Sequence, residues 1–150
     1  MKLYIDGDAF PNLLKPIIHR AIEKLSIQTF VISNKRVNIS ASNLITYIIV
    51  PDGPDEADNK IAKMVENGDL VITADIPLAD QVISKSGFAL DPRGKFWNED
   101  NIKQALAMRD FMESFRESGG ITKGQSPINE KDVRAFANQL NQFLRRQKLH

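Results

Sequence analysis

The sequence predicts an α/β protein with a mostly parallel central sheet and helices on both of its faces. Short apolar runs of strand length alternate with longer segments whose apolar residues recur at helical spacing. Such alternation is typical of parallel strands joined by crossover helices. The 150 residues, 42% hydrophobic and 26% charged, are enough for one domain with its own core. We therefore expect a single three-layer α/β/α domain over residues 1–150.

The first half of the chain contains three predicted strands and two predicted helices. The strands are KLYI (2–5), IQTFVI (27–32) and LITYIIV (44–50). A helix is predicted from Pro11 to Leu25 by the helical spacing of its apolar residues. A second helix is predicted from about Asp55 to Asn67, where Gly68 would close it.

The second half adds two strands and three helices. LVIT (70–73) and FAL (88–90) are the strands, separated by a helix from Ile76 to Ser86. Two longer helices are predicted at about 99–117 and 129–147. The glycine-bearing stretch between them predicts a mobile loop at about 118–128. We expect the core to span about 1–118.

Acidic residues follow the predicted strands. Asp6 and Asp8 come directly after the first strand, Asp75 follows the fourth, and Asp55 and Asp58 begin the helix after the third. Ligands of parallel α/β sheets bind beyond the carboxyl ends of the strands, so these side chains should share one edge. Clustered carboxylates repel one another unless a positive charge compensates. A divalent cation is the simplest candidate.

Each acid also has a structural interpretation. Asp6-Gly7-Asp8 could be a turn. Asp55 is well placed to cap the following helix, which we favour for this residue, and Asp75 could cap the helix that begins at Ile76. Asp58 shares the apolar face of its helix and needs a partner there, so a functional role is favoured for it.

Composition limits the chemistry of any metal site. The chain has no cysteine and only two histidines, so we expect no zinc. We also expect no nucleotide cofactor. Oxygen ligands favour Mg²⁺ or Mn²⁺.

The sequence shows no signal peptide and no apolar run that would span a bilayer, from which we expect a cytoplasmic location and no membrane partner. A net charge of +1 neither requires nor excludes nucleic acid, and the oligomeric state stays open.

The motifs DGDAFP (6–11), DEADN (55–59), VITADIPLA (71–79), DPRG (91–94) and MRDFM (108–112) resemble the YaiI/YqxD family of small bacterial proteins. The resemblance covers Tyr4 to about Leu140. It implies a PIN-like fold, in a family whose biochemical function is largely unassigned. Two departures are Phe10, where relatives typically carry cysteine, and TKGQSP (122–127) in place of a Gly-Gly-Pro-like segment.

PIN domains are metal-dependent nucleases, so the resemblance implies a Mg²⁺- or Mn²⁺-dependent phosphodiesterase acting on RNA or DNA, single-stranded nucleic acid being the expected partner. By motif, Asp6, Asp58 and Asp75 match the acids of PIN domains, and Asp8 belongs to the signature of the family. We expect these four as metal ligands and catalytic residues. Further candidates for phosphate contacts or for orienting the ligands are Thr73, Asp80, Arg93, Arg109 and Lys123.

Two other functions fit the sequence. One is a PIN-like module that binds RNA or a protein without turnover. The other is a phosphatase of the haloacid-dehalogenase type, which would use Asp6 and Asp8, one as nucleophile and the other as acid/base. That class expects a late pair of metal-binding acids after a lysine, and nothing suitable follows Asp91.

Overall fold

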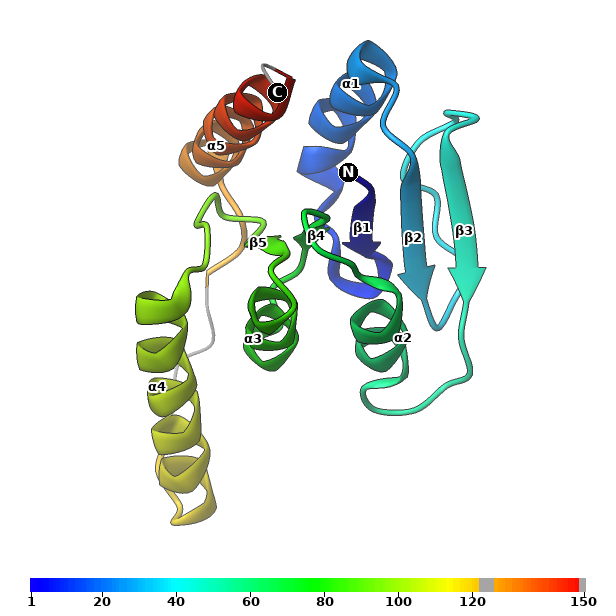
Figure 1. Cartoon of the computed structure of the whole chain (residues 1–150). Helices are drawn as coiled ribbons and strands as arrows, with labels where there is room; N and C mark the ends of the chain where they lie inside the picture. The colour runs from blue at the N-terminus through cyan, green and yellow to red at the C-terminus, as the bar shows by residue number, and fades with distance from the viewer. Residues whose placement is uncertain (122–125, 149–150) are drawn as a thin grey trace.

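A five-stranded sheet with helices on both faces forms the body of the structure, a computed structural model of the chain (Figure 1). The structure describes residues 1–121 and 126–148. The strands are β1 (Leu3–Asp6), β2 (Thr29–Ser33), β3 (Ile45–Ile49), β4 (Leu70–Ile72) and β5 (Phe88–Leu90). The α-helices are α1 (Lys15–Leu25), α2 (Glu56–Met64), α3 (Ile76–Ser84), α4 (Glu99–Glu117) and α5 (Glu130–Lys148). Short 3-10 helices at Gly7–Ala9 and Asn12–Leu14 precede α1.

The strands pair in parallel in the order β3-β2-β1-β4-β5. β1 lies at the centre, where Ile5 is level with Val31 of β2 and with Ile72 of β4. Because all five strands run in one direction, their carboxyl ends meet at one edge of the sheet. The predicted α/β class with a parallel central sheet is confirmed.

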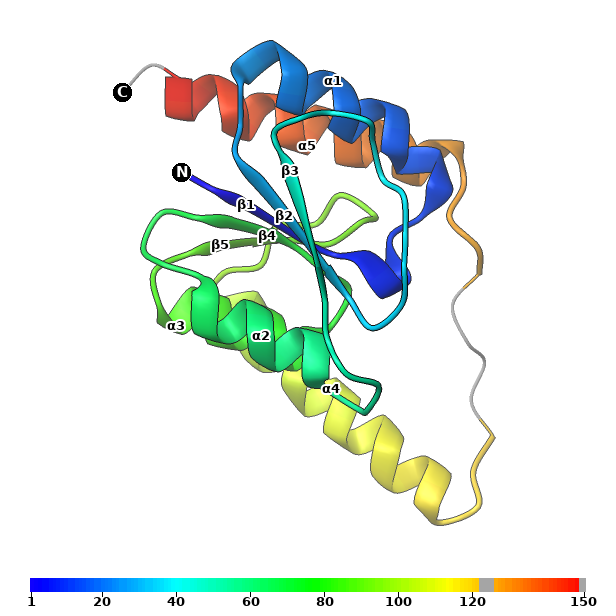
Figure 2. The ribbon, with the colours of Figure 1, turned by 90° about the vertical axis from the view of Figure 1, so that its right-hand side faces the viewer.

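Different helices cover the two faces of the sheet. α1 and α5 lie side by side on one face, and α2 and α3 lie on the other (Figures 1 and 2). Successive side chains of a strand point to opposite faces. Accordingly, Leu3 and Ile5 join the cluster that includes α1 and α5, whereas Tyr4 joins the cluster with α2 and α3. This alternation fixes the register of β1, since a shift by one residue would exchange the two faces.

Three helices are shorter than their sequence pattern predicts. α3 ends at Ser84 instead of Ser86, because Ser86 has left-handed backbone with a φ of 63°. α1 begins at Lys15 instead of Pro11, because Pro11 has extended backbone and Asn12–Leu14 forms a 3-10 turn. α2 ends at Met64 instead of about Asn67, because Val65 leaves the helical conformation and is buried in the core.

The C-terminal helix is part of the core. Phe136 and Leu140 of α5 are almost fully buried in the cluster that covers β1. The expected core of residues 1–118 therefore has to be extended to include α5. Of the loop expected to be mobile at about 118–128, residues 122–125 lie outside the described part of the chain, so its mobility stays a prediction.

α4 leaves the body of the protein along its length. Near its start Ile102 is buried, whereas Met108 and Phe111 in its second half are 60% and 62% exposed. This half extends past the carboxyl ends of the strands (Figures 1 and 2). Among the helices that the structure describes, none combines the length and the apolarity needed to cross a membrane.

The loop after β5 packs so closely against α5 that a larger residue in place of Gly94 should destabilise the protein. Gly94 has a φ of +93°, and a Cβ at this position would lie 2.5 Å from the carbonyl carbon of Ala135 and 2.6 Å from the amide nitrogen of Phe136. Gly68 has a similar φ of +87° but no atom within 4 Å of its added Cβ. Gly68→Ala should therefore lower the free energy of unfolding by about 1–2 kcal/mol, the cost of left-handed backbone alone. Gly94→Ala should cost about 1–3 kcal/mol more, because the backbone of α5 must move.

Urea unfolding of the two variants measures this difference. Equal losses would show that α5 does not pack against this loop as described.

Candidate metal site

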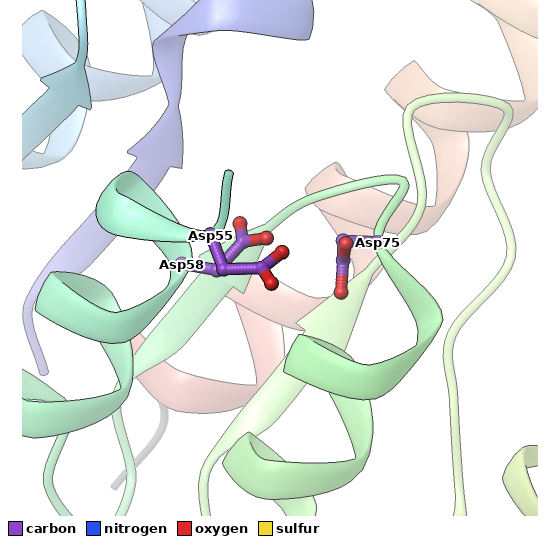
Figure 3. Close-up of side chains that lie close together, drawn as sticks. All are labelled: Asp55, Asp58 and Asp75. Atoms are coloured by element: carbon purple, nitrogen blue, oxygen red, sulfur yellow. The ribbon is translucent and has the colours of Figure 1, made fainter. Parts of the chain in front are cut away.

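Five aspartates lie at or beyond the carboxyl edge of the sheet, and three of them form a cluster. Asp55 and Asp58 come from the start of α2, and Asp75 lies between β4 and α3. One carboxylate oxygen of each lies within 4.8 Å of the others. Figure 3 shows Asp55 and Asp58 directed toward Asp75 across the gap between the two helices. Of the four predicted ligands, the structure thus brings Asp58 and Asp75 together, and adds Asp55.

The side chain of Asp55 does not cap α2. Asp55 occupies the N-cap position, but its carboxylate makes no capping hydrogen bond and its backbone is left-handed, with a φ of 66°. Our expectation that Asp55 is a helix cap is therefore wrong. Asp58 lies three residues further on, on the same side of the first turn, so the two carboxylates are neighbours.

Asp75 does cap its helix. Its Oδ1 accepts a hydrogen bond from the backbone N–H of Leu78 at 2.8 Å. A carboxylate has acceptor capacity for several partners, so this bond leaves the other oxygen of Asp75 available. Asp75 is therefore both the cap of α3 and a member of the cluster.

Thr73 connects Asp75 to Asp6. The Thr73 hydroxyl donates to Oδ2 of Asp6 at 3.3 Å and accepts from the backbone N–H of Asp75 at 3.0 Å. Thr73 is buried directly after β4, beside the end of β1. The parallel pairing of these two strands therefore positions Thr73, Asp6 and Asp75. Asp6 is not a member of the cluster of three, and Thr73 links it to Asp75.

Asp8 is held by the main chain of the neighbouring loop. Both of its carboxylate oxygens accept from the backbone N–H of Asn34, at 3.1 and 2.9 Å. Between the two acids, a Cβ at Gly7 would lie 2.8 Å from Cγ1 of Val31, so only glycine fits against β2. Asp6-Gly7-Asp8 is therefore a tight turn against β2, from which Asp8 is directed toward Asn34.

Burial and mutual repulsion set the charge of the cluster. The pKa of Asp58 rises from 3.8 to about 7, first because burial disfavours the charged form and then because Asp75 and Asp6 carry negative charge nearby. The pKa of Asp6 is also raised, mainly by burial and then by Asp8, while the Thr73 hydrogen bond acts in the opposite direction. Near neutral pH, Asp58 therefore exchanges a proton readily.

Two cavities adjoin the cluster. One, of about 200 Å³, is lined by the three acids together with Asn59, Pro77, Leu78, Gln81 and Arg109. The other, of about 260 Å³, lies on the other side of Asp55 and Asp58 and also contacts Asp6, Asp8 and Asn34. Arg109 thus brings a positive charge from α4 to the edge of the acidic cavity.

The remaining predicted residues lie elsewhere. Asp80 is in the second turn of α3 and lines neither cavity. Arg93 lies 2.7 Å from Asp132 and also donates to the carbonyl of Ser126, so its guanidinium fastens α5 to the loop after β5. Lys123 lies outside the described residues.

Comparisons with known proteins place this chain among bacterial relatives. The model of the family described as "Uncharacterized BCR, YaiI/YqxD family" matches residues 4–146. A UPF0178 protein of Sulfurimonas denitrificans is 62% identical over 144 residues, covering 96% of this chain and 95% of the relative. A UPF0178 protein of a Janthinobacterium strain is 47% identical over 148 residues, covering 99% and 98%.

One solved structure is also similar. The crystal structure of Rae1 (YacP) from Bacillus subtilis aligns with a TM-score of 0.45 and 13% sequence identity, covering 99% of this chain and 95% of that chain.

The raised pKa of Asp58 predicts how stability depends on pH when chelator removes metal ions. Between the pKa of the unfolded chain, near 3.8, and about 7, the folded state binds more protons than the unfolded state. Stability should therefore fall as pH rises through this range. Asp58→Asn should remove this loss, leaving the variant more stable than the wild type at pH 8 by about 1–2 kcal/mol, a value reduced for solvent screening.

Urea unfolding at pH 4 to 8 measures both profiles. Asp80→Asn, in a neighbouring helix but outside the cluster, should follow the wild-type profile. A profile for Asp58→Asn parallel to that of the wild type would contradict the assigned environment of Asp58.

Proposed function

This chain belongs to the YaiI/YqxD family, and we propose that it is a metal-dependent phosphodiesterase that hydrolyses RNA or DNA. The observation that carries the proposal is the cluster of Asp55, Asp58 and Asp75, whose oxygens lie within 4.8 Å of one another beside two helix N-termini. Repelling carboxylates held in one place, with the pKa of one raised to about 7, are a typical sign of a functional site.

The donor set fits Mg²⁺ or Mn²⁺. Both ions bind carboxylate oxygens, and Mg²⁺ is commonly held by one or two carboxylates and by phosphate oxygens of the substrate. Asp55, Asp58 and Asp75 would hold the ion, and Asp6 would support them through Thr73. Of the four expected ligands, this set keeps Asp58 and Asp75, gives Asp6 a supporting role and omits Asp8, and it adds Asp55. A bound cation would supply a water of lowered pKa and offset negative charge on the phosphate.

The protein supplies the surroundings of the phosphate. The first turns of α2 and α3 direct their N-terminal partial positive charge toward the cavity, where it favours anions. Arg109 also lines the cavity from α4, where Asp110 and Glu113, at 3.9 and 3.7 Å, offset part of its positive charge. A cavity of about 200 Å³ is smaller than typical pockets for organic ligands, at roughly 300–1,000 Å³, and suits a phosphate group with its immediate neighbours.

The phosphatase mechanism receives less support. It requires Asp6 and Asp8 to act together on substrate, whereas Asp6 contacts Thr73, Asp8 accepts from the backbone N–H of Asn34, and neither belongs to the cluster of three. A module that binds RNA or protein without turnover would show the same cluster, and only an activity assay separates it from the enzyme.

Cleavage of single-stranded RNA and DNA in Mn²⁺ or Mg²⁺ tests the proposal. The wild type should cleave at least one of these substrates. Asp58→Asn and Asp75→Asn should lower the rate at least about 100-fold, which is the upper end of the loss for residues that only support a metal ligand. Asparagine at position 75 retains the helix cap, so this variant should stay folded.

Asp80→Asn is the matched control, because it removes an equal charge from α3 outside the cavity, and it should retain wild-type activity. Equal cleavage by wild type and Asp75→Asn would identify a contaminating nuclease. Absence of cleavage by the wild type on every substrate would favour the non-catalytic module.

A further inference from the structure

We propose that two copies of this chain associate through the free edge of β3, forming one continuous sheet. β3 is the last strand in the sheet order. Figure 2 views the molecule from the side of β3, and no described segment is drawn over its outer edge. This surface is separate from the acidic cavities, so the inference does not depend on the proposed activity.

Hydrogen bonds identify which backbone groups face outward. The carbonyl of Leu44 accepts from the N–H of Thr29, and the N–H of Val50 donates to the carbonyl of Ser33. Even-numbered residues of this segment therefore direct their backbone groups toward β2. Because this direction alternates along a strand, Tyr47 and Ile49 direct both N–H and C=O away from β2, toward the free edge of the sheet. Within the described residues these groups have no hydrogen-bond partner.

The side chains of β3 lack the usual protection of an edge strand. Natural edges are commonly guarded by lysine, proline, inward-pointing charge or a covering loop. The sequence ITYII carries no charge and no proline, and its Tyr47 and Ile49 side chains are 39% and 56% exposed. Both line a cavity of about 340 Å³ whose other lining residues belong to β2 and the loop after it: Ser33, Arg36, Val37 and Asn38. An uncharged, β-branched edge is the kind of surface that a further strand covers.

A second copy is the occupant that fits this edge. Two-fold symmetry is the commonest arrangement of identical subunits, and it brings the same patch together on both sides. In an antiparallel pair, Tyr47 of one copy would lie opposite Ile49 of the other, and the two residues would exchange hydrogen bonds through their outward-facing N–H and C=O groups. The two-fold axis would repeat this exchange between Ile49 of the first copy and Tyr47 of the second. No like charges meet within the paired strands, because the strand has none. A strand of five residues covers less than the roughly 1,600 Å² of a standard interface, so the dimer should be weak and concentration-dependent.

The second apolar surface of the molecule is less suited to pairing. Met108, Phe111 and Phe115 form an exposed stripe on α4. The backbone of a helix is hydrogen-bonded internally, so this stripe offers apolar area without free donors or acceptors. The same turns carry the acids Asp110, Glu113 and Glu117 and the cations Arg109 and Arg116. Arg109 pairs with Asp110 and Glu113 within the helix, so charge does not select a second copy as the partner of this stripe.

Sedimentation velocity over about 10–500 μM tests the proposal. The wild type should shift from monomer to dimer with concentration, and Ile49→Lys should stay monomeric because it places two like charges together at the edge. Ile49→Pro should also stay monomeric, since it removes an outward N–H without affecting the bonds to β2. Phe111→Lys is the matched control and should dimerise as the wild type does. Circular dichroism establishes that each variant is folded.

Hydrogen exchange of the wild type provides a measurement without variants. The amides of Tyr47 and Ile49 should exchange at least about ten times more slowly at the highest concentration than in dilute solution. A wild type that is monomeric throughout, or unchanged exchange at these two amides, overturns the proposal. Loss of the dimer in Phe111→Lys but not in Ile49→Lys also overturns it, and assigns the interface to α4.

Discussion

Parallel pairing of β1 with β4 is the constraint on which the acidic site depends. The pairing brings Ile5 level with Ile72, so the next residues, Asp6 and Thr73, reach the same edge and form a hydrogen bond of 3.3 Å. The chain turns directly after Thr73 into Asp75 and α3, while α2 begins beside it. The cluster therefore arises from the topology of the sheet, not from any local sequence motif alone.

The arrangement has an electrostatic cost. The pKa of Asp58 near 7 shows that the cluster resists carrying its full negative charge at neutral pH. Capping of α3 by Asp75 and the N-terminal dipoles of α2 and α3 offset part of this cost. A bound cation would offset more, and it would release the proton that Asp58 holds, so its affinity should rise with pH.

Local patterns in the sequence predicted the elements but not every role at the site. FAL and the helix at 99–117 were predicted with the bounds that the structure shows, because glycine, asparagine and periodic apolar residues mark their ends. Asp58 stood out because it shares an apolar face. Asp55 was assigned to a cap because a left-handed backbone after Gly53-Pro54 cannot be read from residue types. The spacing of three residues between Asp55 and Asp58 was the signal in the sequence that could have indicated a shared site.

The roles of Asp8 and Arg93 depend on Asn34 and Asp132, contacts distant in the sequence that no local pattern contains.

Binding of Mn²⁺, measured by electron paramagnetic resonance or calorimetry, tests the central claim most directly, because it asks which aspartates hold a metal without requiring a substrate. The wild type should bind the ion, Asp55→Asn and Asp58→Asn should each weaken binding at least about tenfold, and Asp8→Asn should bind as the wild type does. Absence of binding to the wild type, or loss of binding in Asp8→Asn with retention in Asp55→Asn, would contradict the assignment of the metal site to Asp55, Asp58 and Asp75.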